Sequence, residues 1–257
     1  MILQLPVEIS QPAKRIVSLV PSQTELLYTL GLDQETVAIT KFCVHPHEWY
    51  QHKTRVGGTK TVDLQKVRAL QPDLIIANKE ENVREQVEEL ARHFPVWVTD
   101  VNNLGEACQM IADVGQLTGK KSQAEKLRGD IQFQFPVKST TASLPAAYLI
   151  WKDPYMVAGG DTFIHDMMVR AGFSNVFADR HRYPQVTLPY LAKANTQIVF
   201  LSSEPYPFGE KHISEIKTSL PNAEVILVDG EMFSWYGSRL LLAPAYFQGL
   251  RQRLLSS

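Results

Sequence analysis

A thiol and two imidazoles stand close together in the chain, at Cys43, His45 and His47. On an extended segment alternate side chains point the same way, so these three groups could face one zinc ion. Pro46 disturbs the alternation, and no fourth ligand is spaced nearby. A second interpretation has Phe42 facing a cleft, with both histidines at the surface or in hydrogen bonds.

A carboxylate and an imidazole are also suitably spaced at Asp161 and His165, on one face of a helix predicted from about Thr162 to Ala171. The pair could relay a proton, but Asp161 follows two glycines and is more simply a helix cap. The chain contains no G-x-S-x-G, no H-E-x-x-H and no complete phosphate loop. We therefore predict that the protein is not an enzyme, and a metal-dependent enzyme remains the less favoured alternative.

Two polar stretches carry charges that could meet a ligand. Gly57-Gly58-Thr59-Lys60 resembles half of a phosphate loop but lacks the first glycine at the right distance, so we interpret it as a turn beside a cleft. Residues 78–82, Asn-Lys-Glu-Glu-Asn, follow a predicted strand and precede a predicted helix. Their charges could face a ligand or form a solvated helix cap.

Alternating strands and helices must position these residues. In the first half, short apolar runs predict strands at 15–20, 36–40, 73–77 and 96–99. Ser22 to Glu25 forms an S-x-x-E capping box for a helix that stops at Gly31, and Asp63 caps a second helix. Such alternation implies parallel strands, whose ligands bind beyond the carboxyl ends, so the loops after these strands should line a site.

The alternation restarts in the second half. Strands are predicted at 146–151, 198–203 and 225–228, with a short extended piece at 175–177. Helices are predicted at 162–171, 188–194 and 211–219, and a last one starts at Ser238. Pro244 lies within that last helix and should kink it or mark a second start.

The segment between the halves is built differently. Apolar residues recur at helical spacing from Leu104 to Ile131, and Asn102 or Asn103 could cap the start. We predict one long, gently bent helix over residues 102–137, joining lobes at 1–101 and 138–257. The alternative is two ordinary helices of one domain with a turn at Thr118-Gly119.

Composition narrows the function. The 257 residues carry a net charge of -1 and no basic run, which argues against nucleic acid as a partner. No apolar run approaches the ~20 residues that cross a bilayer, and the two cysteines, Cys43 and Cys108, suggest no disulfide framework. We expect a monomer, periplasmic or extracytoplasmic if an export signal was removed, and cytoplasmic if Met1 is the native start.

Several stretches together resemble the helical-backbone (class III) substrate-binding proteins of ABC importers for cobalamin, haem and iron-siderophores. They are RIVSLVPSQTELLYTLGL, VGGTKTVDLQKVRALQPDLIIANKEEN, GGDTFIHDMMVRAGFSNVF, YPQVTLPYL and MFSWYGSRLLLA, in family order over nearly the whole chain. The resemblance implies two Rossmann-like α/β lobes, a long backbone helix between them, and a ligand cleft between the lobes.

The resemblance also implies site residues. Ligand-contacting aromatics of the cobalamin receptors fall on Phe42, Tyr155 and Tyr183, and a late acidic residue falls on Glu231. Where those receptors have tryptophans in the first lobe, this chain has Thr59 beside Lys60 and Asn78 beside Lys79. Where they have a late arginine, it has Trp235.

These departures favour a flat or aromatic ligand that bears negative charge. The remaining candidate binding residues are Lys41, Lys60, Lys79, Trp235 and Tyr236. We expect Trp235 to form the ligand's wall opposite Phe42, so that Trp235→Ala weakens binding with little change in melting temperature. The function expected is non-catalytic binding of a metal chelate of the cobalamin, haem or ferric siderophore class for ABC-type uptake, with no tightly bound cofactor.

Two positions argue against docking on an ABC permease as the resemblance would imply. The family docks through one acidic residue on each lobe, and at those places this chain has Gln65 and Pro189. Glu85, Glu88 or Glu204 could substitute. The alternative function is an intracellular binding protein or sensor of the same fold that does not dock on a permease.

Overall fold

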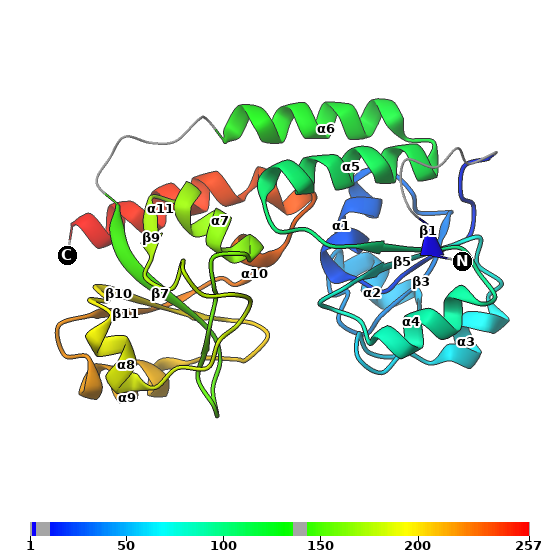
Figure 1. Cartoon of the computed structure of the whole chain (residues 1–257). Coiled ribbons are helices and arrows are strands. Elements are labelled where there is room, and N and C mark those ends of the chain that lie inside the picture. Colours follow the sequence, from blue (N-terminus) through cyan, green and yellow to red (C-terminus); the bar gives the residue numbers. More distant parts are fainter. Residues whose placement is uncertain (1, 4–10, 136–142, 257) are drawn as a thin grey trace. The chain divides into compact units, whose positions relative to one another are not determined.

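The computed structural model describes residues 2–3, 11–135 and 143–256 (Figure 1). The chain forms two compact units. The first consists of Met1–Val101, Gly105–Gln132 and Tyr236–Arg239, and the second of Asn102–Leu104, Phe133–Trp235 and Leu240–Ser257. In the part of the chain that the structure describes, no helix is both long and apolar enough to span a bilayer.

The first unit is built on a six-stranded sheet in the order β1-β6-β5-β2-β3-β4. Every neighbouring pair in it is parallel, as the alternation of strands and helices predicted. The strands are β1 (Ile2–Leu3), β2 (Ile16–Ser18), β3 (Thr36–Ile39), β4 (Thr54–Arg55), β5 (Leu74–Asn78) and β6 (Val96–Thr99). Their carboxyl ends therefore meet at one edge of the sheet, where the candidate residues of the first half follow.

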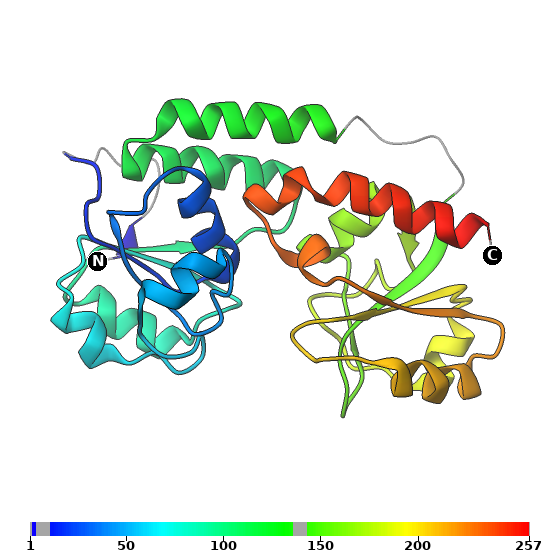
Figure 2. The same ribbon diagram turned by 180° about the vertical axis from the view of Figure 1, so that it is seen from behind.

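Four shorter helices of this unit are α1 (Pro21–Thr29), α2 (His47–His52), α3 (Leu64–Ala69) and α4 (Arg84–Ala91). Figures 1 and 2 show α3 and α4 on the side of the sheet opposite the long helix α5 (Leu104–Thr118). Val67 of α3 and Val87 and Leu90 of α4 join the strand residues Val17 and Ile75 in one buried apolar cluster. Burial of these apolar side chains is what holds the helices on this face.

The ends of the helices confirm some of the predicted capping residues and contradict one. Asp63 caps α3, because its Oδ1 accepts a hydrogen bond from the amide of Lys66 at 3.1 Å. Gly31 ends the first helix with a left-handed φ of 73°, as predicted. The expected capping box at Ser22 is wrong: α1 already begins at Pro21, with Val20 as a cap that has no side-chain hydrogen bond. Proline needs no amide partner at a first helical position.

The expected long helix over residues 102–137 is also wrong. The segment forms two helices, α5 (Leu104–Thr118) and α6 (Lys121–Gln134), which lie side by side in Figures 1 and 2. Gly119 turns the chain with φ of 72°, and a Cβ at Gly115 would lie only 2.4 Å from Cβ of Ala124. The alternative turn at Thr118-Gly119 is the one observed, because the two glycines permit both the reversal and the close contact.

The second unit has a five-stranded sheet with the path β11-β10-β7-β8, and β9 also pairs with β7. The strands are β7 (Leu144–Trp151), β8 (Met156–Val157), β9 (Phe173–Asn175), β10 (Ile198–Ser202) and β11 (Glu224–Val228). Only the β7–β8 pair among these is antiparallel. Residues 136–142, which include the expected end of the long helix and the expected start of the second lobe, lie outside the described residues.

The helices of this unit are α7 (Phe163–Arg170), α8 (Leu188–Lys193), α9 (Glu210–Ser219), the short α10 (Glu231–Ser234) and α11 (Ala243–Leu255). Leu191 of α8 and Ile216 of α9 pack with strand residues such as Val199. A 3₁₀ turn over Ser238–Leu241 precedes α11, and Pro244 lies in the first turn of that helix. Of the two predictions made for Pro244, a kink or a second helix start, the second is therefore confirmed.

Candidate functional site

Buried amides join the loops at the carboxyl edge of the first sheet. Asn82 Nδ2 donates to the carbonyls of Leu19 and Thr59, at 3.2 and 3.1 Å, and so links the loops after β2 and β4. Asn78 Nδ2 donates to the carbonyl of Thr99 at 3.0 Å, which links the ends of β5 and β6. The asparagines of residues 78–82 therefore tie loops together, which neither interpretation of this segment's charges had included. These buried hydrogen bonds make the edge a firm support.

Phe42 is the exposed aromatic residue of this edge, with half of its surface open to solvent. The ammonium of Lys41 lies 5.1 Å from the centre of its ring, which is a cation–π distance. Gly58 lies directly beneath both residues: a Cβ there would come within 3.1 Å of the Phe42 ring and 3.2 Å of Lys41 Cε. The structure thus places the expected residues Lys41 and Phe42 against the turn that begins at Gly57.

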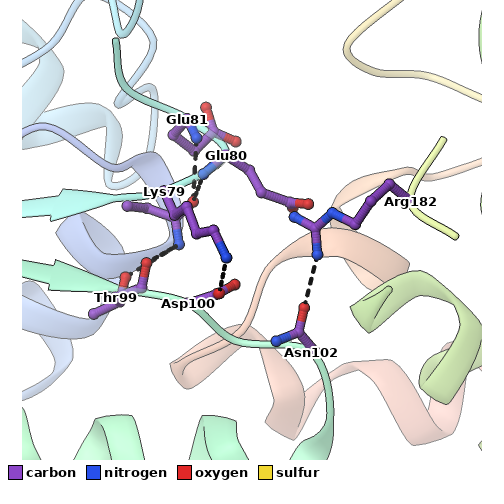
Figure 3. A network of polar contacts seen from close by, with 8 residues as sticks. Lys79, Glu80, Glu81, Thr99, Asp100, Asn102 and Arg182 are labelled. Carbon is purple, nitrogen blue, oxygen red and sulfur yellow. Dashed lines mark hydrogen bonds and ion pairs between the residues drawn. The ribbon is translucent and has the colours of Figure 1, made fainter. Parts of the chain in front are cut away.

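The other two lysines that were candidate binding residues in the first unit have different partners. Lys60 Nζ donates to the backbone carbonyl of Glu80. Lys79 forms an ion pair with Asp100 at 2.6 Å, and Figure 3 shows this contact beside the loop of Glu80 and Glu81. The charge of Lys79 is therefore already balanced by a carboxylate, which weakens its case as an anion ligand.

The possible metal site does not form. Cys43 is fully buried, with its Sγ 3.1 Å from Thr24 Oγ1 and 3.2 Å from Thr40 Oγ1, and burial raises the pKa of the thiol. His47 is exposed, and its Nε2 lies 2.8 Å from Gln51 Nε2. Among the described residues, no group of three or more His, Cys, Asp or Glu could hold a metal ion.

In the second unit, Tyr155 is half-buried and held by α9. Its hydroxyl donates to Glu215 Oε1 at 2.7 Å, and Lys152 also pairs with Glu215. Burial, and then the hydrogen bond to the Glu215 carboxylate, raise the pKa of Tyr155, so the ring stays neutral. The pKa of Glu215 is lowered, first by the hydrogen bond from Lys152. The phenol of Tyr155 is occupied, which leaves its ring as the surface that could meet a ligand.

Trp235 is more deeply placed than its polar neighbours in the sequence suggested. It is 6% exposed, and its Nε1 donates to Glu204 Oε1 at 2.8 Å. Ser234 Oγ donates to the same oxygen at 2.6 Å. Removal from water raises the pKa of Glu204, although these hydrogen bonds lower it. Glu204 therefore joins the loop after β10 to the loop after β11.

The remaining expected residues lie on separate loops. Glu231 begins α10 and is half-buried, with its amide 3.1 Å from Asp229 Oδ1. Tyr183 lies on a half-buried segment that runs beside β8. The amide of Val157 in β8 donates a hydrogen bond to the carbonyl of the next residue, Pro184. Tyr236 is buried and belongs to the first unit, in the segment Tyr236–Arg239.

Two aromatic residues of the second unit were missed. Trp151 ends β7 with 40% of its surface exposed, and Tyr206 follows β10. Their rings meet edge to face at 5.6 Å. The signal was available: an aromatic residue at or soon after the carboxyl end of a strand is a candidate by the same argument that selected Phe42.

Asp161 and His165 do not form a catalytic pair. Asp161 Oδ1 accepts from the amide of Arg182, and Oδ2 lies 3.4 Å from Nδ1 of His181. The helix cap is Thr162, whose Oγ1 accepts from the amide of His165 at 3.2 Å, so the expected cap role of Asp161 is wrong. Burial lowers the pKa of His165. Arg182 also donates to Asn102 at 3.1 Å (Figure 3).

Two α/β units with aromatic and charged loops at the carboxyl ends of their strands define a binding protein of the two-lobe class. The family model described as periplasmic binding protein matches residues 16–225, and the chain belongs to this family. A vitamin B12-binding protein of Pectobacterium carotovorum is 25% identical over 239 residues, covering 90% of this chain and 85% of that relative.

Solved structures show the same fold. The periplasmic vitamin B12-binding protein of Vibrio cholerae aligns with a TM-score of 0.76 and 21% identity, covering 94% of this chain and 99% of that one. The periplasmic haem-binding protein of the same organism aligns with a TM-score of 0.78 and 19% identity, covering 92% and 98%. The predicted fold class, two α/β lobes of the substrate-binding type, is confirmed, apart from its single long helix.

Proposed function

We propose that this protein binds a small metal chelate of the cobalamin, haem or ferric siderophore class and hands it unchanged to an ABC importer. Membership of the periplasmic binding protein family supports this, as does the similarity to a vitamin B12-binding protein over 90% of the chain. We propose a periplasmic or extracytoplasmic location on the same ground, and a monomer as the working form.

The observation that carries the proposal is the exposed ring of Phe42 on a firm loop edge. What distinguishes this half-exposed ring from exposed aromatic residues elsewhere, such as Phe133, is its place at the edge where parallel sheets bind their ligands. Tyr155, Trp151 and Tyr206 occupy the matching loops of the second unit. Aromatic faces suit the flat or macrocyclic surface of such chelates.

Non-catalytic binding is supported by membership of a family of binding proteins and by the partners that the candidate catalytic groups have. The thiol of Cys43 is enclosed by threonines, and Asp161 is bound to backbone rather than to His165. A general base needs to be within hydrogen-bond reach of its partner. Neither set meets that requirement.

Native mass spectrometry with an absorbance titration tests the proposal. The protein is exposed to haem, cyanocobalamin and a ferric hydroxamate in turn. We expect one protein chain to take up one of these with micromolar affinity or better, and to release it with unchanged mass. The proposal is wrong if the folded protein binds none of them.

The second candidate function is a binding protein or sensor that does not dock on a permease. Gln65 is exposed in the first turn of α3, and Pro189 is exposed in the first turn of α8, so neither position offers a charge. Glu204 is a poor substitute because its carboxylate already accepts two hydrogen bonds. Cell fractionation separates the two functions: we expect the protein outside the cytoplasmic membrane, and a cytoplasmic pool would favour the sensor.

A further inference from the structure

Lys41 and Phe42 lie against Gly58, and Lys60 follows two residues later on the same turn; these four residues are called here the Lys41–Lys60 rim. The Lys41 side chain packs on Gly58, because a Cβ at Gly58 would lie 3.2 Å from Lys41 Cε. Its ammonium stands 5.1 Å from the centre of the Phe42 ring. The rim therefore sets a cation beside an aromatic face, and Gly58 is the residue that allows the close approach.

The turn that carries Lys60 is held on several sides. Gly58 and Thr61 exchange two backbone hydrogen bonds, at 3.1 and 3.2 Å. Asn82 donates to the carbonyl of Thr59 at 3.1 Å, and Lys60 itself donates to the carbonyl of Glu80. The rim is thus largely organised before any ligand arrives, which lowers the entropy lost on binding.

The charge of the rim is not balanced by a carboxylate. Within the described residues, no carboxylate lies within ion-pair distance of the ammonium of Lys41 or of Lys60. Four other lysines of the same unit, among the described residues, do have such partners: Lys53 pairs with Asp33, Lys66 with Asp63, Lys79 with Asp100 and Lys126 with Asp130. Glu80 and Glu81 follow on the next loop, and Asn78 Oδ1 accepts their amides.

We infer that the Lys41–Lys60 rim is a carboxylate subsite, and that the ligand is a metal chelate with a carboxylate beside a flat or apolar face. The face packs on Phe42, and the carboxylate accepts charge-assisted hydrogen bonds from the two ammonium groups. This inference rests on the proposed function and narrows it: chelates with carboxylates are selected over uncharged corrinoids and hydroxamates. The specificity arises because an uncharged ligand would cover two cations without pairing them.

Haem and its dimethyl ester test the subsite, because the ester keeps the ring and the iron but masks both carboxylates. Titration of the full-length protein is followed by absorbance. We expect haem to bind about tenfold or more tightly than the ester. Lys41→Met and Lys60→Met should each weaken haem binding about five- to tenfold and leave ester binding unchanged.

Lys66→Met is the matched control, since it removes one positive charge from the same unit outside the rim. It should leave the ratio of haem to ester affinity unchanged. Equal binding of haem and ester by the parent, or a ratio unchanged in both rim variants, overturns the carboxylate subsite and leaves the proposed function intact. Tight binding of cyanocobalamin in preference to haem does the same. If none of these chelates and no ferric siderophore binds, the proposed function fails and the subsite fails with it.

Discussion

The loop edges of the two units present aromatic residues in opposite ways. In the first unit, Phe42 is half exposed and stands beside a cation on a glycine turn. In the second, Trp235 is 6% exposed and Tyr155 is half-buried, and each gives its polar hydrogen to a glutamate, Glu204 or Glu215. The first edge offers the open ring of Phe42, whereas at the second edge glutamates hold Trp235 and Tyr155 and the open ring is that of Trp151.

The comparison separates binding from stability. An exposed ring contributes little to folding, so replacing a ring that contacts a ligand should change binding more than stability. A buried tryptophan contributes to folding whether or not it meets a ligand. The two edges should therefore respond differently to the same kind of substitution.

Trp235→Ala should have the largest effect on stability. Loss of a buried indole costs about 3–5 kcal/mol in the free energy of unfolding, and it also leaves Glu204 without one of its donors. This replaces the sequence-based expectation of an unchanged melting temperature, because that expectation assumed an exposed loop residue. Urea denaturation measures the difference. If the free energy of unfolding changes by less than about 1 kcal/mol, Trp235 contributes as little to stability as an exposed ring, and the contrast between the two edges is wrong.

Phe42→Ala should show the reverse. We expect affinity for the bound chelate to fall by about 1–2 kcal/mol, while the free energy of unfolding changes by less than about 0.5 kcal/mol. Ligand titration and urea denaturation of the same sample measure both. Phe133→Ala is the control, since Phe133 is an 88% exposed phenylalanine on α6 and should change neither quantity. Lost stability with unchanged affinity would assign Phe42 to the core.

Glu204→Gln sharpens the comparison through pH. Because the pKa of Glu204 is raised, the folded state binds its proton more tightly than the unfolded state. The stability of the parent should therefore fall as pH rises from the ordinary glutamate value to the raised one. Glutamine does not titrate, so the stability of the variant relative to the parent should increase over that window and then level off. If the difference in denaturation midpoint between variant and parent does not change with pH, the carboxylate of Glu204 is not buried.

Glu215→Gln should have the smallest effect. Lys152 and Tyr155 lower the pKa of Glu215 and so stabilise the fold above the ordinary glutamate pKa, and this stabilisation is lost as pH falls through the lowered value. The carboxylate is largely open to solvent, so we expect a loss of less than about 0.5 kcal/mol at neutral pH, weaker still in high salt. A loss above about 2 kcal/mol in the free energy of unfolding would show that the contacts of Glu215 behave as buried interactions.

Much of the architecture could be read from local patterns. Apolar runs marked β2, β3, β5, β6, β7, β10 and β11 to within about two residues. Asp63, Gly31 and Pro244 marked helix ends and starts correctly because capping depends on a few neighbouring residues. The position of Phe42 at a carboxyl edge followed from parallel pairing alone.

Other features depended on residues far away in the chain. Gly115 meets Ala124 only because the chain reverses between them, so periodicity alone could not separate a hairpin from a rod. Trp235 can be buried because Glu204, from another loop, accepts the hydrogen bond of its indole. The thiol of Cys43 is buried against Thr24 of α1, so it does not face the two histidines as a metal ligand would. Local sequence therefore determined where most strands and helices form, but not whether the segment between the two halves is one helix or two. Only the tertiary structure decided which polar atoms those residues would meet, because hydrogen-bond partners and burial are set by packing between distant segments.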